Sequence, residues 1–157
     1  MFLLLFLYIR GMNIALVAHD SRKKELIEWV TYNLNELKNH KLYATGTTGK
    51  LIQKAYLDMK EEFENEHDIR PLKENWERYN NEANNLITCL HSGPLGGDQE
   101  IGSMIANGQV DALIFFCDNL IMQGHQNDVS ALTRLKTRLM IIIIAKHFYI
   151  KELIKQK

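Results

Sequence analysis

The sequence predicts an α/β fold, a single-domain doubly wound three-layer sandwich with a mainly parallel sheet. Short apolar stretches alternate with stretches of helical spacing, which is the pattern of a sheet covered by helices. Turns rich in Gly, Thr, Ser and Asp follow the apolar stretches. Because the chain has 157 residues and 46% of them are hydrophobic, it has room for one buried core.

Four apolar stretches are the predicted strands, and they cover residues 14–18, 41–44, 86–90 and 110–116. Helical spacing predicts helices between them, near residues 26–34, 50–56 and 99–107. Apart from Asp111 the fourth strand is apolar, as expected where a parallel sheet buries both faces of a strand. In such sheets ligands bind beyond the carboxyl ends of the strands, so we expect a site in the loops that follow them.

Three segments are expected to lie outside the core of the domain, which covers residues 12–145. Residues 1–11 are an apolar N-terminal extension, too short to span a bilayer and without the basic leader and cleavage site of a signal peptide. Residues 58–85 are charged and rich in Asn, which favours a surface insertion, part helix and part loop. Residues 146–157 form a C-terminal tail.

The composition argues against several classes of partner. Nineteen basic and nineteen acidic side chains cancel, so the chain lacks the overall field that attracts proteins to nucleic acid or to a membrane surface. Cys89 and Cys117 form no C-x-x-C motif and are too few for a disulfide framework. We therefore expect a cytoplasmic protein that binds neither nucleic acid nor membrane.

The loop after the second predicted strand consists of Thr45, Gly46, Thr47, Thr48 and Gly49. Hydroxyls, backbone N–H groups and the positive end of a helix dipole suit a phosphate monoester. The spacing is neither that of a P-loop nor that of the dinucleotide fingerprint. Taken alone, the segment is explained equally well by threonines that cap a helix at a glycine turn.

A second glycine loop, residues 92–98, follows the third predicted strand. It offers the hydroxyl of Ser92 and backbone donors near Gly93, and it ends in the carboxylate of Asp98. Lys23, on the first predicted helix, can add a positive charge. Two such loops at successive strand ends favour a phosphate site over two unrelated turns.

Placing a carboxylate beside a phosphate is electrostatically unfavourable, so such a carboxylate is expected to have a chemical function. Removing a proton from carbon next to a carbonyl is one such function. Asp98 is the predicted base. An imidazole suits the carbonyl oxygen where negative charge develops, and both His19 and His125 follow strand ends. Two alternatives stay open: Asp98 as the N-cap of the next helix, and His125 as an ordinary surface residue.

Several of these side chains are of types that ligate metals. The close H-x-x-x-H or H-x-E patterns of metal hydrolases are missing, so we expect no metal. The residues concerned are His19, Asp20, Asp98, Asp118, His125 and Asp128.

Four blocks, in this order along residues 12–135, resemble methylglyoxal synthase. Their combination of paired glycine loops is highly specific. The blocks are residues 17–20 (VAHD), 42–49 (LYATGTTG), 92–99 (SGPLGGDQ) and 111–118 (DALIFFCD), the last followed by His125, Asp128 and residues 129–135 (VSALTRL).

The resemblance implies a fold and a reaction. It implies a methylglyoxal synthase-like sandwich and a carbon–oxygen lyase that converts dihydroxyacetone phosphate to methylglyoxal and inorganic phosphate, a glycolytic bypass. The implied steps are proton abstraction, enediolate formation and phosphate elimination, without a metal or organic cofactor. Inorganic phosphate is the product and an expected inhibitor, and the family implies a homo-oligomer, typically a hexamer.

The resemblance also implies roles for individual residues. Asp98 is the implied base, and His125 is implied to serve the oxygens of the enediolate. The implied substrate and phosphate site consists of His19, Lys23, Thr45, Gly46, Thr47, Thr48, Ser92 and Gly93, with Asp20, Asp118 and Asp128 as a supporting polar shell.

Three departures from the family pattern affect these expectations. The segment between the two glycine loops is longer, and prolines usual after the fourth strand and around His125 are absent. After Leu135 the chain can still form a fifth strand at residues 141–145, but the tail that follows is atypical. Two alternatives to an active synthase follow: a phosphate-binding regulatory domain of the same fold without catalysis, and a synthase inactivated by its altered C-terminus.

Overall fold

The computed structural model describes residues 11–67, 72–117 and 140–144. Its centre is a five-stranded sheet with the strand order β3-β2-β1-β4-β5, in which every neighbouring pair is parallel. This confirms the predicted α/β class and its parallel sheet, now with the fifth strand included. The strands are β1 (Asn13–Ala18), β2 (Lys41–Ala44), β3 (Ile87–Cys89), β4 (Ala112–Phe116) and β5 (Met140–Ile144).

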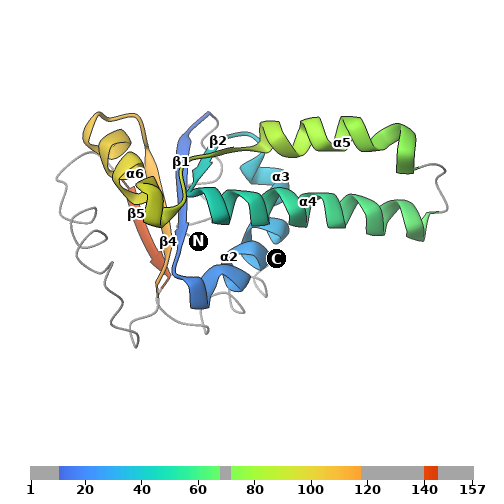
Figure 1. Ribbon diagram of the computed structural model, residues 1–157, viewed down its shortest axis with the longest axis horizontal. Helices are drawn as coiled ribbons and strands as arrows, with labels where there is room; N and C mark the ends of the chain where they lie inside the picture. The colour runs from blue at the N-terminus through green and yellow to red at the C-terminus, as the bar shows by residue number, and fades with distance from the viewer. Residues whose placement is uncertain (1–10, 68–71, 118–139, 145–157) are drawn as a thin grey trace.

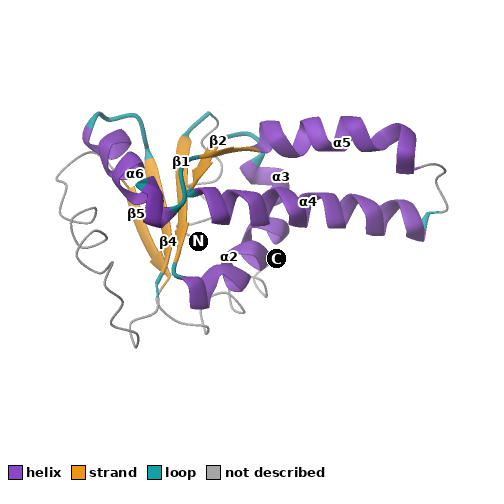
Figure 2. Ribbon diagram, in the orientation of Figure 1, coloured by secondary structure: helices purple, strands orange, loops and turns teal. Residues whose placement is uncertain are grey.

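Helices cover both faces of this sheet. Figure 2 shows α6 on one side of it and α2, α3 and α4 on the other. None of the described helices is long and apolar enough to cross a membrane. The helices are α2 (Lys23–Tyr32), α3 (Leu34–Leu37), α4 (Gly46–Glu66), α5 (Leu72–Leu86) and α6 (Gly97–Ala106), with short 3-10 turns η1 (Asp20–Arg22) and η2 (Gly93–Leu95).

The order of the strands fixes where a ligand can bind. The chain moves from β1 outward to β2 and β3, and then crosses back to β4 on the other side of β1. Connections between parallel strands are right-handed, so this reversal puts α6 on the opposite face from α2 and α4. The strand order therefore reverses between β1 and β4, and a ligand crevice is expected at the carboxyl ends of these two strands.

The core consists of two apolar layers, one on each face of the sheet. Successive side chains of a strand point to opposite faces, so Leu16 packs in the cluster that holds Trp29 and Phe116, whereas Val17 packs in the cluster that holds Ile101. Trp29 and Phe116 are fully buried, with ring centroids 6.1 Å apart. These two layers hold the strand ends, and hence the loops that follow them, in fixed positions.

Helices α4 and α5 form an antiparallel hairpin that extends away from the sheet (Figure 1). The seam between them is polar: Tyr56 donates to Glu82 at 2.5 Å, and Tyr79 donates to Glu64 at 2.6 Å. Glu64 is buried, and Asn75 also donates to it at 3.0 Å. The charged segment at residues 58–85 thus contributes the outer half of α4 and most of α5.

The structure corrects two predicted helix boundaries. The helix predicted at residues 50–56 begins at Gly46 and ends at Glu66, and the helix predicted near residues 99–107 begins at Gly97 and ends at Ala106. Both starts lie inside segments that the sequence pattern assigned to loops, because glycine and threonine are poor helix formers in isolation. Most of the first glycine loop is therefore the first turn of α4, whereas in the second loop Gly93–Leu95 form the 3-10 turn η2 and only Gly97 and Asp98 belong to α6.

Candidate functional site

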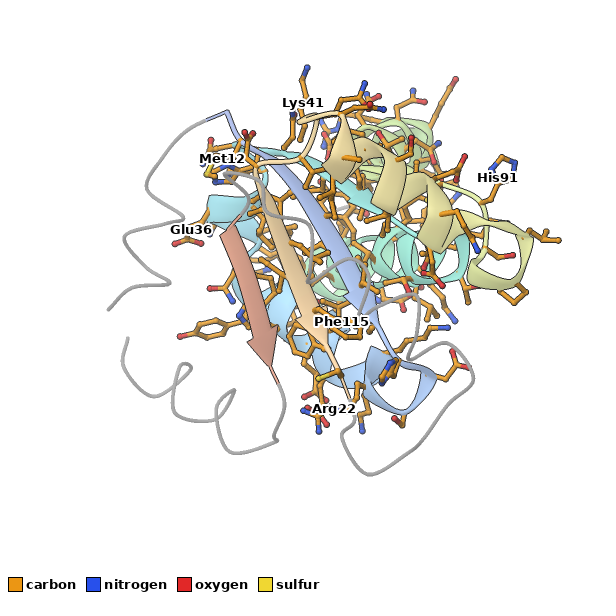
Figure 3. All side chains as sticks on the ribbon, turned by 90° about the vertical axis from the view of Figure 1, so that its left-hand side faces the viewer. Met12, Arg22, Glu36, Lys41, His91 and Phe115 are labelled. Atoms are coloured by element: carbon orange, nitrogen blue, oxygen red, sulfur yellow. The ribbon has the colours of Figure 1, made fainter. Side chains whose placement is uncertain are left out.

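A pocket of about 360 Å³ opens at the carboxyl ends of the strands. In Figure 3, β1, β4 and β5 point toward the end where Phe115 and Arg22 lie, and Met12 and Lys41 lie at the opposite end. Residues that are distant in sequence meet here, because parallel strands bring their ends to one edge. The pocket is lined by Val17, Ala18, His19, Asp20, Lys23, Thr45, Thr47, Gly93, Pro94, Asp98 and Phe115.

The β1 side of the pocket carries an imidazole and the pocket's lysine. The His19 backbone N–H donates to the carbonyl of Phe116 at 3.0 Å, which continues the pairing of β1 with β4. Its ring meets that of Phe115 edge-on, with centroids 5.1 Å apart. Lys23 lies in the first turn of α2 and forms an ion pair with Asp20 at 2.5 Å. The Lys23 side chain is 21% exposed, whereas that of Asp20 is 82% exposed.

The threonine segment is the N-terminus of α4. Thr45 occupies the N-cap position but makes no side-chain cap hydrogen bond, so the simple capping interpretation does not describe it. Instead its hydroxyl donates to the hydroxyl of Thr48 at 3.2 Å, and Thr48 is fully buried. Thr47 is exposed and lines the pocket together with Thr45. Hydroxyls and the positive end of the helix thus face the same space.

The second glycine segment brings a carboxylate to the pocket. Asp98 lies in the first turn of α6, whose N-cap is Gly96 in the left-handed region at a φ of 98°. The alternative that Asp98 is the N-cap is therefore wrong. A Cβ added to Gly93 would lie 3.3 Å from Asp98 Oδ2, so the carboxylate stands directly over this glycine. A larger residue at position 93 would crowd the carboxylate.

Seven of the predicted site residues line this one pocket: His19, Asp20, Lys23, Thr45, Thr47, Gly93 and Asp98. Gly46, Thr48 and Ser92 belong to the same turns but are not among the lining residues. His125, Asp118 and Asp128 lie outside the described residues.

Sequence reasoning missed four lining residues: Val17, Ala18, Pro94 and Phe115. Val17, Ala18 and Phe115 stand at the carboxyl ends of β1 and β4, so their place in the strands was the available signal. Pro94 lies inside the glycine loop and was quoted only as part of a motif. Over the described ranges, no group of three or more His, Cys, Asp or Glu residues is placed to hold a metal ion.

Comparisons with known proteins show which family the chain is similar to. The model of the MGS-like domain family matches residues 25–145. The chain is 44% identical to the methylglyoxal synthase of Maridesulfovibrio salexigens over 78% of its own length and 69% of that protein, and 44% identical to that of Yersinia enterocolitica over 80% of its own length and 64% of that protein.

A solved structure agrees as well. The crystal structure of methylglyoxal synthase from Elizabethkingia anophelis superposes with a TM-score of 0.56 at 32% identity, covering 94% of this chain and 78% of that one. The chain spans about two thirds of the length of the curated relatives it matches. With a family model that matches residues 25–145, a shared fold and this degree of identity, the chain belongs to the methylglyoxal synthase family.

Proposed function

We propose that the chain converts dihydroxyacetone phosphate to methylglyoxal and inorganic phosphate. Membership of the methylglyoxal synthase family makes it an enzyme, a lyase. The observation that carries the proposal for this chain is the pocket in which Asp98, Lys23 and the N-terminus of α4 meet. A general base, a cation and a phosphate-binding helix end are the groups that this elimination needs.

The phosphate of the substrate is proposed to bind between α4 and Lys23. The first turn of α4 supplies a positive dipole end and the hydroxyls of Thr45 and Thr47. Lys23 is mostly buried and held by Asp20, so its ammonium stays at the pocket wall. Binding the phosphate here fixes the three-carbon chain of the substrate and directs its other end toward α6.

Asp98 is proposed to remove a proton from the hydroxymethyl carbon. The electrons of the broken C–H bond form the enediolate, whose negative oxygen needs a hydrogen-bond donor. His19, which lines the pocket, is one available donor, and His125 is proposed as another from the family resemblance. The enediolate electrons then expel phosphate as the C–O bond breaks, and the enol that remains rearranges to methylglyoxal.

A carboxylate favours catalysis over binding alone. A pocket that only bound phosphate would gain nothing from Asp98, because its negative charge repels the ligand. The carboxylate is useful when a proton must be removed, and its position over Gly93 sets it beside the loop that faces the substrate. For this reason we favour the lyase over a regulatory domain of the same fold that binds phosphate.

The direct test is formation of methylglyoxal from dihydroxyacetone phosphate by the purified chain. Asp98→Asn keeps the shape of the side chain and removes the base, so turnover should fall by roughly 10²- to 10⁴-fold. Asp58→Asn, on an exposed position of α4, is the matched control and should leave turnover unchanged. Phosphate binding measured by calorimetry should be retained in Asp98→Asn.

The outcomes separate the alternatives. Product from the wild type and loss of it in Asp98→Asn support the lyase. A wild type that binds phosphate but forms no product contradicts the proposed activity and favours either the binding domain or a synthase inactivated by its altered C-terminus. Restoring a family-like C-terminal segment then separates these two, because it revives only the inactivated synthase.

We also propose three properties of the working enzyme. Inorganic phosphate should inhibit competitively, since it is a product that fits the substrate's phosphate site. The chain should assemble as a homo-oligomer, a hexamer by resemblance, which analytical ultracentrifugation measures. A cytoplasmic location is expected for an enzyme whose substrate is a phosphorylated sugar intermediate, and fractionation of cells tests it.

A further inference from the structure

The backbone of His91 joins the two segments that line the pocket. Its carbonyl accepts the N–H of Gly46 at 2.9 Å, which ties it to the first turn of α4. The same carbonyl lies so close to Gly97 that a Cβ added there would be 2.0 Å from the oxygen. Gly97 opens α6, the helix that carries Asp98. One peptide group therefore sets the spacing between the proposed phosphate site and the proposed base.

Glu100 holds the backbone of His91 at the preceding peptide group, the one that carries the His91 N–H. Its Oε2 accepts the backbone N–H of His91 at 2.8 Å, and its Oε1 lies 2.7 Å from Nδ1 of the same residue. Both oxygens of the carboxylate thus engage one residue. Glu100 lies in the first turn of α6, two positions after Asp98. Figure 3 shows His91 at the surface, pointing away from the sheet. The contact between Glu100 and His91 therefore lies on the outer side of the loop that follows β3.

The contacts with His91 change the pKa of the Glu100 carboxyl group. The backbone N–H of His91, and after it the His91 ring, lower the pKa of Glu100 from its ordinary value. Glu100 is therefore ionised at neutral pH, and hydrogen bonds to an ionised acceptor are roughly twice as strong as neutral ones. An alanine at this position would remove both contacts, whereas a glutamine would keep the shape and one oxygen acceptor.

We propose that Glu100 is a positioning residue that sets the distance between the phosphate-binding end of α4 and Asp98 by fixing the backbone of His91, whose N–H it accepts and whose carbonyl accepts the Gly46 N–H. It does not line the pocket and acts only through His91. The inference rests on the proposed function and deepens it, because it explains how phosphate and base are kept in register. Misplacing reacting groups by about 1 Å can cost roughly a hundredfold in rate, so loosening the backbone of His91 should have a measurable effect on the reaction.

The test compares Glu100→Ala, Glu100→Gln and Glu77→Ala in the full chain. Glu77 is an exposed glutamate of α5 and serves as the matched control. The measured quantities are kcat and KM for dihydroxyacetone phosphate, and the Kd and stoichiometry of inorganic phosphate by calorimetry. Glu100→Ala should lower kcat by up to roughly a hundredfold and raise KM and Kd roughly tenfold with unchanged stoichiometry, because the base and the Gly46 end of α4 are both displaced.

Two further variants distinguish positioning from a general loss of structure. Glu100→Gln should bring KM and Kd back close to their wild-type values, because its amide oxygen still accepts the His91 N–H. His91→Ala keeps the backbone N–H and loses only the ring, so KM and Kd should stay within about twofold of wild type, as expected for an exposed side-chain contact. A purely structural defect would instead reduce the binding stoichiometry and leave Kd unchanged.

The two readouts separate this inference from the proposed function. If the wild type is active and Glu100→Ala behaves like Glu77→Ala, the positioning role is overturned and the lyase stands. If the wild type forms no product but binds phosphate, and Glu100→Ala weakens that binding while Glu100→Gln restores it, the positioning role stands without the reaction. A wild type that does not bind phosphate overturns both.

Discussion

Gly49, in a helix of the proposed site, lies close against the side chain of Cys89 in the sheet. Gly49 is buried in the first turn of α4, and Cys89 is the last residue of β3. A Cβ built on Gly49 would lie 2.5 Å from the Cys89 Sγ, 3.3 Å from its Cβ and 3.4 Å from its Cα. The mutation Gly49→Ala therefore collides mainly with one sulfur atom.

The size of the effect follows from two opposing terms. Forcing an extra methyl group into a packed site costs about 1–3 kcal/mol. Alanine gains about 1 kcal/mol over glycine inside a helix, so the net cost in the wild type should be about 0–2 kcal/mol. In a Cys89→Ala background the sulfur is gone and the nearest contact is the 3.3 Å one to Cβ, so Gly49→Ala should be neutral or stabilising by up to about 1 kcal/mol.

The assay is urea unfolding of the wild type, the two single variants and the double variant. The coupling between positions 49 and 89 should be about 1–2 kcal/mol, with the double variant more stable than the sum of the singles predicts. If Gly49→Ala costs the same in both backgrounds, the sulfur is not the obstacle and the reasoning is refuted. Turnover in the double variant then reports whether the start of α4 has kept its position.

Three further outcomes are expected. Tyr79→Phe leaves the buried Glu64 with one donor fewer and should lower the free energy of unfolding by about 1–3 kcal/mol, measured in urea. Gly97→Ala cannot fit against the His91 carbonyl and should lower both the thermal midpoint and turnover, and a wild-type midpoint would contradict the contact. Because the pKa of Glu100 is lowered in the folded chain, its stabilisation is present above the ordinary value of 4.5 and is lost as pH falls through the folded value. Unfolding curves of Glu100→Gln and wild type should therefore differ at neutral pH and converge in acid.

The fold was predictable because its signals are local. Residues 14–18 and 112–116 are apolar runs of strand length, and the stretches between strands have helical spacing, so each element is encoded in its own residues. The rule that ligands bind at the carboxyl ends of parallel strands then placed the site before any contact was known. Asp98 and Thr47 were identified in this way, and both line the pocket.

Helix starts were less predictable, for a physical reason. Gly46 and Gly97 are poor helix formers, so a local pattern places the helix after them. In the structure both glycines are in the first helical turn because the backbone of residues 90–92 passes too close for a side chain. That close approach is a contact in the folded structure, and the residue spacing of neither loop predicts it.

The sequence by itself determined the layers, the parallel sheet and the segments that meet at its carboxyl edge. Only the tertiary structure decided which side chains reach the pocket: Thr48 turns into the core and bonds Thr45, and Phe115 joins the lining from β4. It also revealed that Glu100 holds the backbone of His91 between the N-termini of α4 and α6. Periodicity is a property of neighbours along the chain, whereas the direction of a side chain and its distance to a remote peptide depend on the twist of the sheet and the path of each loop.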